Sequence, residues 1–253
     1  MLSFLREKKG VDLDSRETTL QHRKIILSKS FLRKLYIYWY KLLLEKIPEN
    51  EIFDILEIGS GGGFIKTLNS KIITSDILDG VDCDMKFSAE ELPFKDNSLD
   101  DILMIDVLHH LPDCRKFFSE ACRTLRQGGR IIMIEPANTI FSSFIYRHFH
   151  HENFNPDAKE WSFTTSGPLS GANGALPWII FKRDYASFKL LFPNLRCESI
   201  VFHTPFAYLV SGGLSYKSLL PGWSFGIFII FEKLISPLNR WIAMFQTVTV
   251  CKD

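Results

Sequence analysis

Four glycines lie within the five positions 59–63, and a short apolar segment comes directly before them. Residues 52–58 read Ile-Phe-Asp-Ile-Leu-Glu-Ile, a run that predicts a buried parallel strand. The glycines then form a loop at the carboxyl end of that strand. Ligands bind at this edge of open α/β sheets, because glycine lets the backbone come close and the next helix presents unpaired N–H groups. The sequence therefore predicts an α/β fold that binds a ligand here.

The spacing of these glycines separates three classes of ligand. A nucleoside-triphosphate loop would need glycines at positions 60 and 65, which are serine and isoleucine. A dinucleotide fingerprint would need glycine at position 64, which is phenylalanine. The pattern that fits is acid-x-G-x-G-x-G, formed by Glu57, Gly59, Gly61 and Gly63. The carboxylate of Glu57 inside such a turn suits a cationic ligand, and S-adenosylmethionine carries an ammonium and a sulfonium group.

Composition limits the class of protein. The 253 residues, 46% of them hydrophobic, are enough for one well-buried domain with a cap. Charge is uneven, because residues 51–113 carry 4 basic and 14 acidic groups whereas the segments on both sides are basic. An acidic ligand region disfavours nucleic acid as a partner. Five scattered cysteines, no signal-peptide pattern and no apolar run of spanning length predict a cytoplasmic protein without a transmembrane segment.

The chain beyond the glycine loop alternates between strand and helix patterns. Asp76 ends a second predicted strand, 17 residues beyond Gly59, close to the distance at which an acidic side chain bonds ribose hydroxyls in such folds. Repeated units of this kind predict a parallel sheet with right-handed crossovers. The later elements are a strand at 101–106, a helix at 114–126 that the glycines at 128–129 stop, and a strand at 130–135.

Five motifs in this order carry a family resemblance: "LEIGSGGG", "SD", "SAEELPF", "LHHLPD" and "RTLRQGGRIIMIEP". Together they cover about residues 52–137 and are similar to class I S-adenosylmethionine-dependent methyltransferases, in the broad group that includes quinone-biosynthesis enzymes. The resemblance implies a doubly wound, mostly parallel seven-stranded sheet with helices that cap it. The final "FQTVTVCKD" is similar to the antiparallel last strand of that fold.

The resemblance also implies which residues hold the cofactor. The methionine end would lie against the first glycines, the ribose against the second strand, and the sulfonium against the end of the fourth strand. At the adenine this sequence departs from the family, because serine stands where an aspartate is usual, and a hydroxyl gives a weaker bond to the adenine amino group. The implied cofactor-binding residues are Glu57, Gly59, Ser60, Gly61, Asp76, Ile77, Ser88, Ala89, Asp106, Val107 and Leu108.

Three histidines are candidates for handling a proton of the acceptor. Residues 140–151 predict a helix whose end lies over the carboxyl edge of the sheet, which brings His150 and His151 toward the acceptor. We expect one of them, with His151 favoured, to act as the base or to orient the acceptor. His110 and then Glu135 are the next candidates for the base. The histidines at 148–151 are close to acidic residues, but we expect no metal site, since such clusters are more often hydrogen-bonded surface histidines.

The chain divides into a shared core and regions of its own. We expect an N-terminal helical cap at 1–50, formed by one long helix or a bent pair, and a cofactor-binding core at 51–203. This core would include an ordered substrate loop at 151–183, which is polar and glycine-rich. An apolar helical insertion follows at 204–243, and residues 244–253 form the last strand of the core. The insertion is interpreted either as a buried cap or as an apolar acceptor pocket or membrane-surface contact.

These observations predict an S-adenosylmethionine-dependent methyltransferase that acts on a hydroxyl of a small or lipid-like molecule. Methyl transfer needs mainly in-line alignment of donor and acceptor, so no fixed catalytic motif is expected. Two alternatives stay open. One is a protein that binds S-adenosylmethionine without turnover, and the other is a nicotinamide-dependent oxidoreductase, which Phe64 disfavours. The predicted location is the cytoplasm or a membrane surface, and the sequence indicates no oligomeric state.

Overall fold

A seven-stranded sheet organises the computed structural model, which describes residues 14–45, 47, 54–150, 152–165, 167 and 170–253. The strand order is β3-β2-β1-β4-β5-β7-β6, and β7 alone runs antiparallel to its neighbours. The predicted mostly parallel sheet with an antiparallel last strand is therefore confirmed. The strands are β1 (Ile55–Ile58), β2 (Ile73–Asp76), β3 (Met85–Lys86), β4 (Leu99–Ile105), β5 (Leu125–Pro136), β6 (Leu195–His203) and β7 (Phe245–Lys252).

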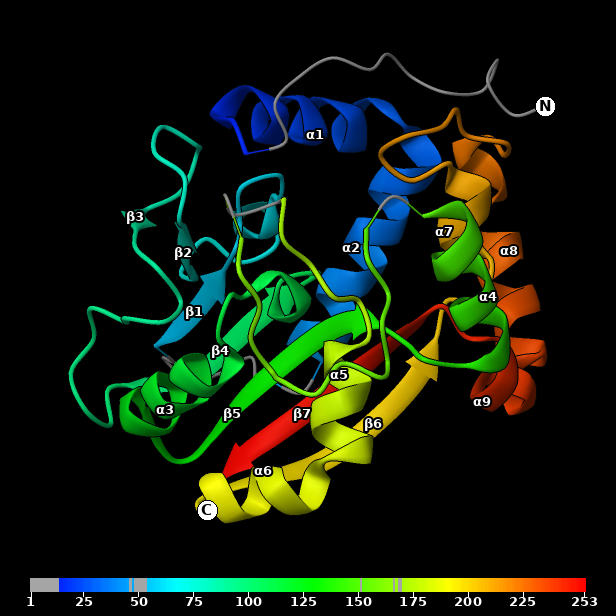
Figure 1. The fold of residues 1–253 in the computed structure, drawn as a ribbon. Helices are drawn as coiled ribbons and strands as arrows, with labels where there is room; N and C mark the ends of the chain where they lie inside the picture. The colour runs from blue at the N-terminus through cyan, green and yellow to red at the C-terminus, as the bar shows by residue number, and fades with distance from the viewer. Residues whose placement is uncertain (1–13, 46, 48–53, 151, 166, 168–169) are drawn as a thin grey trace.

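The centre of the sheet is apolar because helices cover both of its faces. In the middle of β4 and β5, Ile102 pairs with Ile131 and Met104 with Met133, and all four side chains are buried. A strand buried on both faces needs this continuous apolar pattern. In Figure 1, α3 (Cys114–Thr124) and α6 (Tyr185–Leu191) lie in front of the sheet, and α2 (Ser30–Leu44) lies behind it.

The N-terminal region forms the bent pair of helices that was one of the two predicted arrangements. Ser15 caps α1 (Arg16–Ser28) by accepting a hydrogen bond from the Thr18 N–H. The extended backbone of Lys29 ends α1, and α2 starts at the next residue. Trp39 and Tyr40 of α2 are buried, so this helix packs these two aromatic side chains into the core.

Helix α3 ends two residues before the predicted position. Asp113 caps its start, but the helix stops at Thr124 and β5 begins at Leu125. The glycines at 128–129 therefore lie within the long strand β5 and do not end the helix. The physical reason is that the end of the helix bonds to the segment just before β4. The N–H groups of residues 97 and 98 donate to the carbonyls of residues 123 and 124, so the chain joins the sheet directly after Thr124.

The segment after β5 is only partly the polar loop that the sequence predicted. Helix α4 (Ile140–Phe149) comes first, with a capping box between Thr139 and Ser142. The end of the predicted loop 151–183 is helical, as α5 (Leu176–Trp178) and the π-helix η4 (Ile179–Arg183). A run of apolar side chains at 176–181, all but one of them buried, explains this error, because it packs as a helix against the core.

Short helices fill the apolar region before the last strand, and prolines and glycines separate several of them. The division into four domains stays a prediction, since these helices pack directly on α2 and α4. The elements of this region are α7 (Ala207–Ser211), η5 (Gly222–Ser224), α8 (Phe225–Leu234), η6 (Ser236–Leu238) and α9 (Asn239–Ile242). The described helices are completed by η2 (Ile65–Thr67) and η3 (Leu108–His110).

Candidate cofactor and acceptor site

A cavity of about 920 Å³ lies at the carboxyl ends of β1, β4 and β5. The cavity is large enough for a cofactor and part of an acceptor. Ser60 and Leu108 do not line it, and Leu108 is buried behind the wall. His151 lies outside the described residues. The predicted residues that the structure does bring to the cavity wall are Glu57, Gly59, Gly61, Asp76, Ile77, Ser88, Ala89, Asp106, Val107, His110 and His150.

Close packing explains why the loop after β1 needs glycine. Gly59 has a φ of +70°, and a Cβ atom there would lie 2.5 Å from a methyl group of Val107. A Cβ atom on Gly61 would lie 2.6 Å from Oδ2 of Asp76. The loop therefore folds tightly against the neighbouring strand ends, and it presents its backbone to the cavity.

Glu57 places a carboxyl group with an unsatisfied oxygen at the cavity. Its side chain is 3% exposed, and among the described residues its Oε2 atom has no hydrogen-bond partner. Burial raises the pKa of Glu57 to about 7, although the neighbouring Ser60 and Tyr40 hydroxyls lower it in part. A buried carboxyl oxygen without a partner beside an open cavity fits a ligand that brings a cation or a hydrogen-bond donor.

Asp76 is held rigidly on the cavity wall at the end of β2. Its Oδ2 atom accepts a hydrogen bond from the Gly61 N–H at 2.9 Å, and Oδ1 accepts one from the Leu78 N–H at 2.8 Å. Each carboxylate oxygen has a second lone-pair direction, so both can also accept from the two hydroxyls of a ribose. Burial raises the pKa of Asp76 above its ordinary value.

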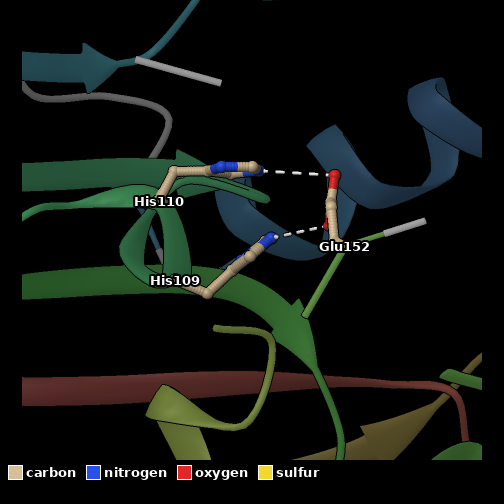
Figure 2. Close-up of side chains that lie close together, drawn as sticks. All are labelled: His109, His110 and Glu152. Carbon is tan, nitrogen blue, oxygen red and sulfur yellow. Dashed lines mark ion pairs between the residues drawn. The ribbon is translucent and has the colours of Figure 1, made fainter. Parts of the chain in front are cut away.

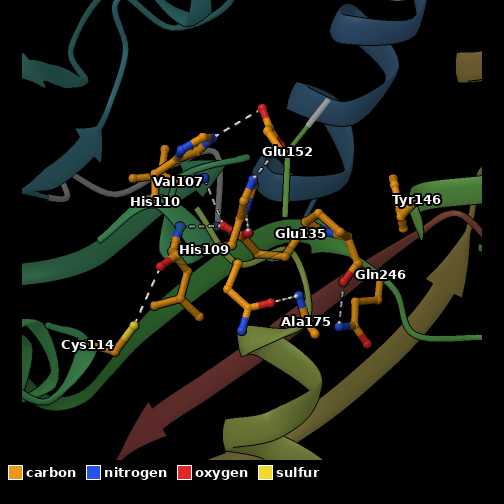
Figure 3. A network of polar contacts seen from close by, with 12 residues as sticks. Val107, His109, His110, Cys114, Glu135, Tyr146, Glu152, Ala175 and Gln246 are labelled. Carbon is orange, nitrogen blue, oxygen red and sulfur yellow. Dashed lines mark hydrogen bonds and ion pairs between the residues drawn. The ribbon is translucent and has the colours of Figure 1, made fainter. Parts of the chain in front are cut away.

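Glu135, at the end of β5, fixes the segment that follows β4. Its Oε1 atom accepts hydrogen bonds from the N–H groups of Val107, at 2.9 Å, and Leu108, at 2.7 Å (Figure 3). Its Oε2 atom lies 2.6 Å from Nδ1 of His109, which is also buried. One side chain therefore holds three consecutive residues, of which Val107 and His109 line the cavity. Asp106, just before them, has a φ of +58°, and this turns the chain toward Glu135.

Glu152 lies between two histidine rings at the cavity. Its Oε2 atom is 3.5 Å from Nε2 of His109, and its Oε1 atom is 3.6 Å from Nε2 of His110 (Figure 2). His150 is close to the same carboxylate, with its Nδ1 atom 3.7 Å from Oε2 of Glu152. Burial lowers the pKa of His110 to about 4. Burial also acts to raise the pKa of Glu152, but His109 outweighs it and lowers that pKa below its ordinary range.

The roles of several residues at this wall, or directly behind it, were not predicted from the sequence. Glu135, which is buried behind the wall, was predicted only as a reserve base, and Glu152 was given no role. Tyr146 and Tyr208 were not identified, although both side chains line the cavity. A signal for Glu135 did exist, because it ends the strand next to β4, and parallel strands bring their carboxyl ends to one edge.

Methyltransferases are found among the known proteins that this chain is similar to. Residues 56–133 match the family model described as a methyltransferase domain. The chain is 31% identical over 127 residues to the ubiquinone/menaquinone biosynthesis C-methyltransferase UbiE of Rickettsia massiliae, a match that covers 40% of this chain and 51% of UbiE. It is 36% identical over 61 residues to the uncharacterized methyltransferase YcgJ of Bacillus subtilis, covering 23% of this chain and 24% of YcgJ. The matches thus span about half or less of these curated relatives.

The likeness to solved structures extends over nearly the whole chain. A crystal structure of an S-adenosylmethionine-dependent methyltransferase from Thermotoga maritima superposes with a TM-score of 0.54 and 16% identity. The superposition covers 94% of this chain and 98% of that one. At this identity the likeness shows the fold. Residues 56–133 thus match a methyltransferase domain, and the chain as a whole has the fold of a known S-adenosylmethionine-dependent methyltransferase.

Proposed function

We propose that this chain transfers a methyl group from S-adenosylmethionine to a hydroxyl of a lipid-like acceptor. The observation that carries the cofactor assignment is Glu57, a cavity-lining residue next to the glycine loop whose buried Oε2 atom has no hydrogen-bond partner among the described residues. The ammonium of the methionine end would bind there, and Asp76 would hold the ribose hydroxyls. Ile77, Ser88 and Ala89 would contact the adenine, and Asp106 and Val107 would lie near the sulfonium.

The work of the protein in this reaction is mainly positional. When bound, S-adenosylmethionine supplies a methyl group on a sulfonium, which is already a good leaving group. The chain has to hold the acceptor in line with that methyl group and exclude water. Tyr146, Tyr208 and Phe245 line the cavity together with the histidines, so its wall combines aromatic rings with a few polar groups. Such a lining favours an acceptor with an apolar body and one polar reacting group.

Titration calorimetry with S-adenosylmethionine, S-adenosylhomocysteine and NAD tests the cofactor assignment. We expect the first two to bind and NAD to give no heat of binding. Phe64 supports this expectation, because it is buried against Tyr36 and Tyr40 at the position where a dinucleotide loop needs glycine. Incubation with tritiated donor and fractionated cell extract then tests turnover. Label in the lipid fraction supports the proposal, and binding without any labelled product favours the non-catalytic alternative.

His150 is the predicted catalytic histidine that the geometry favours for contact with the acceptor. Its Nδ1 atom accepts a hydrogen bond from the Glu152 N–H at 3.3 Å, so the neutral ring carries its proton on Nε2. That arrangement suits a ring that orients the acceptor oxygen. We expect His150→Ala to lower kcat about 10-fold to 100-fold and to leave the cofactor Kd unchanged. Steady-state kinetics with the labelled acceptor, alongside calorimetry, measures both, and wild-type turnover would remove His150 from the site.

An exposed apolar stripe points to the environment of the acceptor. Side chains at i, i+3, i+4 and i+7 share one face of a helix. We call the following set the apolar face: Trp223, Ile227, Ile230, Phe231, Leu234, Leu238 and Trp241, each at least 39% exposed. Ile140, Phe144 and Phe149 of α4, which contacts α9, add exposed apolar area next to it (Figure 1).

The charges around the apolar face complement an anionic lipid surface. In α4 and residues 206–243, the exposed charged side chains are Arg147, Lys217, Lys233 and Arg240. Glu232, the one acidic residue of these segments, is buried and accepts hydrogen bonds from the Phe206 and Ala207 N–H groups. Helices that combine an exposed apolar face with exposed basic side chains are typical of proteins that lie on membranes. We infer that the apolar face binds an anionic membrane surface.

The helices that carry the apolar face contact helices that line the cavity. Helix α4 carries Phe144 and Phe149 outward, and it carries Tyr146 on the cavity wall. Tyr208 of α7 lines the cavity as well, and α7 contacts α8. Among the described residues, no helix has the length and apolar character needed to cross a bilayer. A lipid-like acceptor held at a membrane surface would thus lie near the cavity.

A further inference from the structure

Two imidazole rings and a carboxylate converge at one point of the cavity wall. The ligand atoms of His109, His110 and Glu152 all lie within 4.8 Å of one another, and all three residues line the cavity (Figure 2). We propose that these three side chains bind a divalent transition-metal ion, with Nε2 of each histidine and the Glu152 carboxylate as ligands. Two histidines and one carboxylate with open positions are a common set for Zn²⁺ and Fe²⁺.

A polar contact at Nδ1 orients each of the two histidine rings, as is usual for histidines that bind a metal. Nδ1 of His109 lies 2.6 Å from the Glu135 carboxylate, which two backbone N–H groups also hold. Nδ1 of His110 lies 3.1 Å from the carbonyl oxygen of Gly171. A carboxylate and a carbonyl only accept hydrogen bonds, so Nδ1 donates in both rings. Each Nε2 atom, which faces Glu152, is then the nitrogen left to bind an ion.

The distances suit a shared ion better than direct hydrogen bonds. The two separations between Nε2 and the Glu152 oxygens are 3.5 and 3.6 Å. Hydrogen bonds between nitrogen and oxygen are shorter, at about 2.7–3.2 Å. Two ligands that each lie about 2.1 Å from a tetrahedral metal are about 3.4 Å apart, from the bond lengths and the angle. An ion between these atoms therefore needs only small movements of the side chains.

Charge and access also favour a cation. Carboxyl oxygens of Asp106 and Glu135 lie within 4.8 Å of a ring nitrogen of His109, which adds negative charge close to the ligands. Three protein ligands leave a coordination position that faces the cavity, where the acceptor has to lie. No metal was expected from the sequence, because only the histidines at 148–151 were considered as ligands, and the pair that follows β4 was not.

The role of the ion rests on the proposed function, but its binding does not. If methyl transfer goes to a hydroxyl, an ion at this position would bind the acceptor oxygen and favour its deprotonated form. Without an ion, His109 and Glu152 form an ion pair when the ring is protonated. Metal binding by the full chain distinguishes these two states of the cluster. It can be measured with no methyl donor or acceptor present.

The test is metal titration of the full chain after treatment with a chelator. Zn²⁺ binding is measured by calorimetry, and Co²⁺ is added separately because its absorption spectrum reports the ligands. We expect one ion per chain and about a 100-fold or greater loss of affinity in His110→Ala and in Glu152→Gln. Glu135→Gln, which removes only an orienting group, should lose about 10-fold.

His148→Ala is the matched control, because His148 is an exposed histidine on α4 that bonds to the Phe144 carbonyl. It should keep wild-type affinity and the wild-type Co²⁺ spectrum. Circular dichroism of each variant shows whether it is folded, and Glu152→Gln, at a half-buried surface position, serves if another variant does not fold. Equal affinity in the control and in the folded ligand variants, or no binding by the wild type, would overturn the site. A failure of methyl transfer alone would leave it standing.

Discussion

Replacing Glu57 with glutamine is expected to weaken S-adenosylmethionine binding about 100-fold, which corresponds to about 3 kcal/mol. The variant keeps the shape of the side chain but removes its charge. An ammonium group that binds beside the buried Oε2 atom then loses the only charged partner that the proposed site gives it, and the amide N–H groups repel it. Titration calorimetry measures the effect, with Glu91→Gln as the control because Glu91 is exposed. An unchanged Kd in a folded Glu57→Gln variant would show that the methionine end binds elsewhere.

The pH dependence of the same affinity follows from the raised pKa of Glu57. Burial raises this pKa to about 7, with Asp76 raising it further and Ser60, Tyr40 and Arg23 lowering it. Below pH 7 the carboxyl group is increasingly protonated in the free protein, so a proton has to leave before the ammonium binds. The α-amino group stays charged in this range, since its pKa is about 7.7–8.0. Affinity should therefore fall by up to about 10-fold per pH unit below 7 in the wild type. The glutamine variant should lose the part of this dependence that comes from Glu57 and keep the part that comes from Asp106, whose pKa burial also raises to about 7.

The proposed cofactor-binding residues could be predicted from the sequence because short segments of the chain determine where they lie. Gly59 and Gly61 lie next to Glu57 in the chain, and their spacing alone implies a tight loop with a carboxylate in it. Asp76 ends a strand that must pair beside β1, so its place at the cavity follows from the order of the βα units. In each case the relevant contact joins neighbouring strands of one sheet, whose arrangement the family pattern fixes.

The part that the sequence did not predict depends on contacts between distant segments. Glu152 comes 17 residues after Glu135, yet both lie against the ring of His109. Gly171, which orients His110, belongs to a loop that has no pattern of its own. The side chain of Asn173 helps to set the position of this loop, because it accepts a hydrogen bond from the Asn155 N–H and donates one to the Asn155 carbonyl, and Phe154 beside it is buried. Hydrophobic periodicity carries no information on such pairings, so a role for Glu152 could not be predicted from the sequence.

Serine substitutions at Trp223, Ile227, Ile230 and Leu234 are expected to reduce binding to anionic vesicles about 100-fold or more. These side chains are 76%, 66%, 62% and 76% exposed, so the fold should tolerate the change. Each large apolar side chain contributes about 1 kcal/mol or more when it enters the membrane interface, and four of them together dominate the binding energy. Vesicle sedimentation with phosphatidylglycerol-containing and pure phosphatidylcholine vesicles measures the loss and its dependence on lipid charge.

The control for this variant is a serine substitution at Leu190 and Leu191 of α6, which are 82% and 49% exposed but lie away from the apolar face (Figure 1). That change removes exposed apolar area without touching the proposed contact, so vesicle binding should stay at the wild-type level. Charge reversal at Lys233 and Arg240 should weaken binding to anionic vesicles and leave the small affinity for neutral ones unchanged.

Equal binding by all variants would contradict a membrane contact. Self-association of the wild type that the four serines abolish would instead assign the apolar face to a second copy of the chain, because burial between protomers needs no lipid charge.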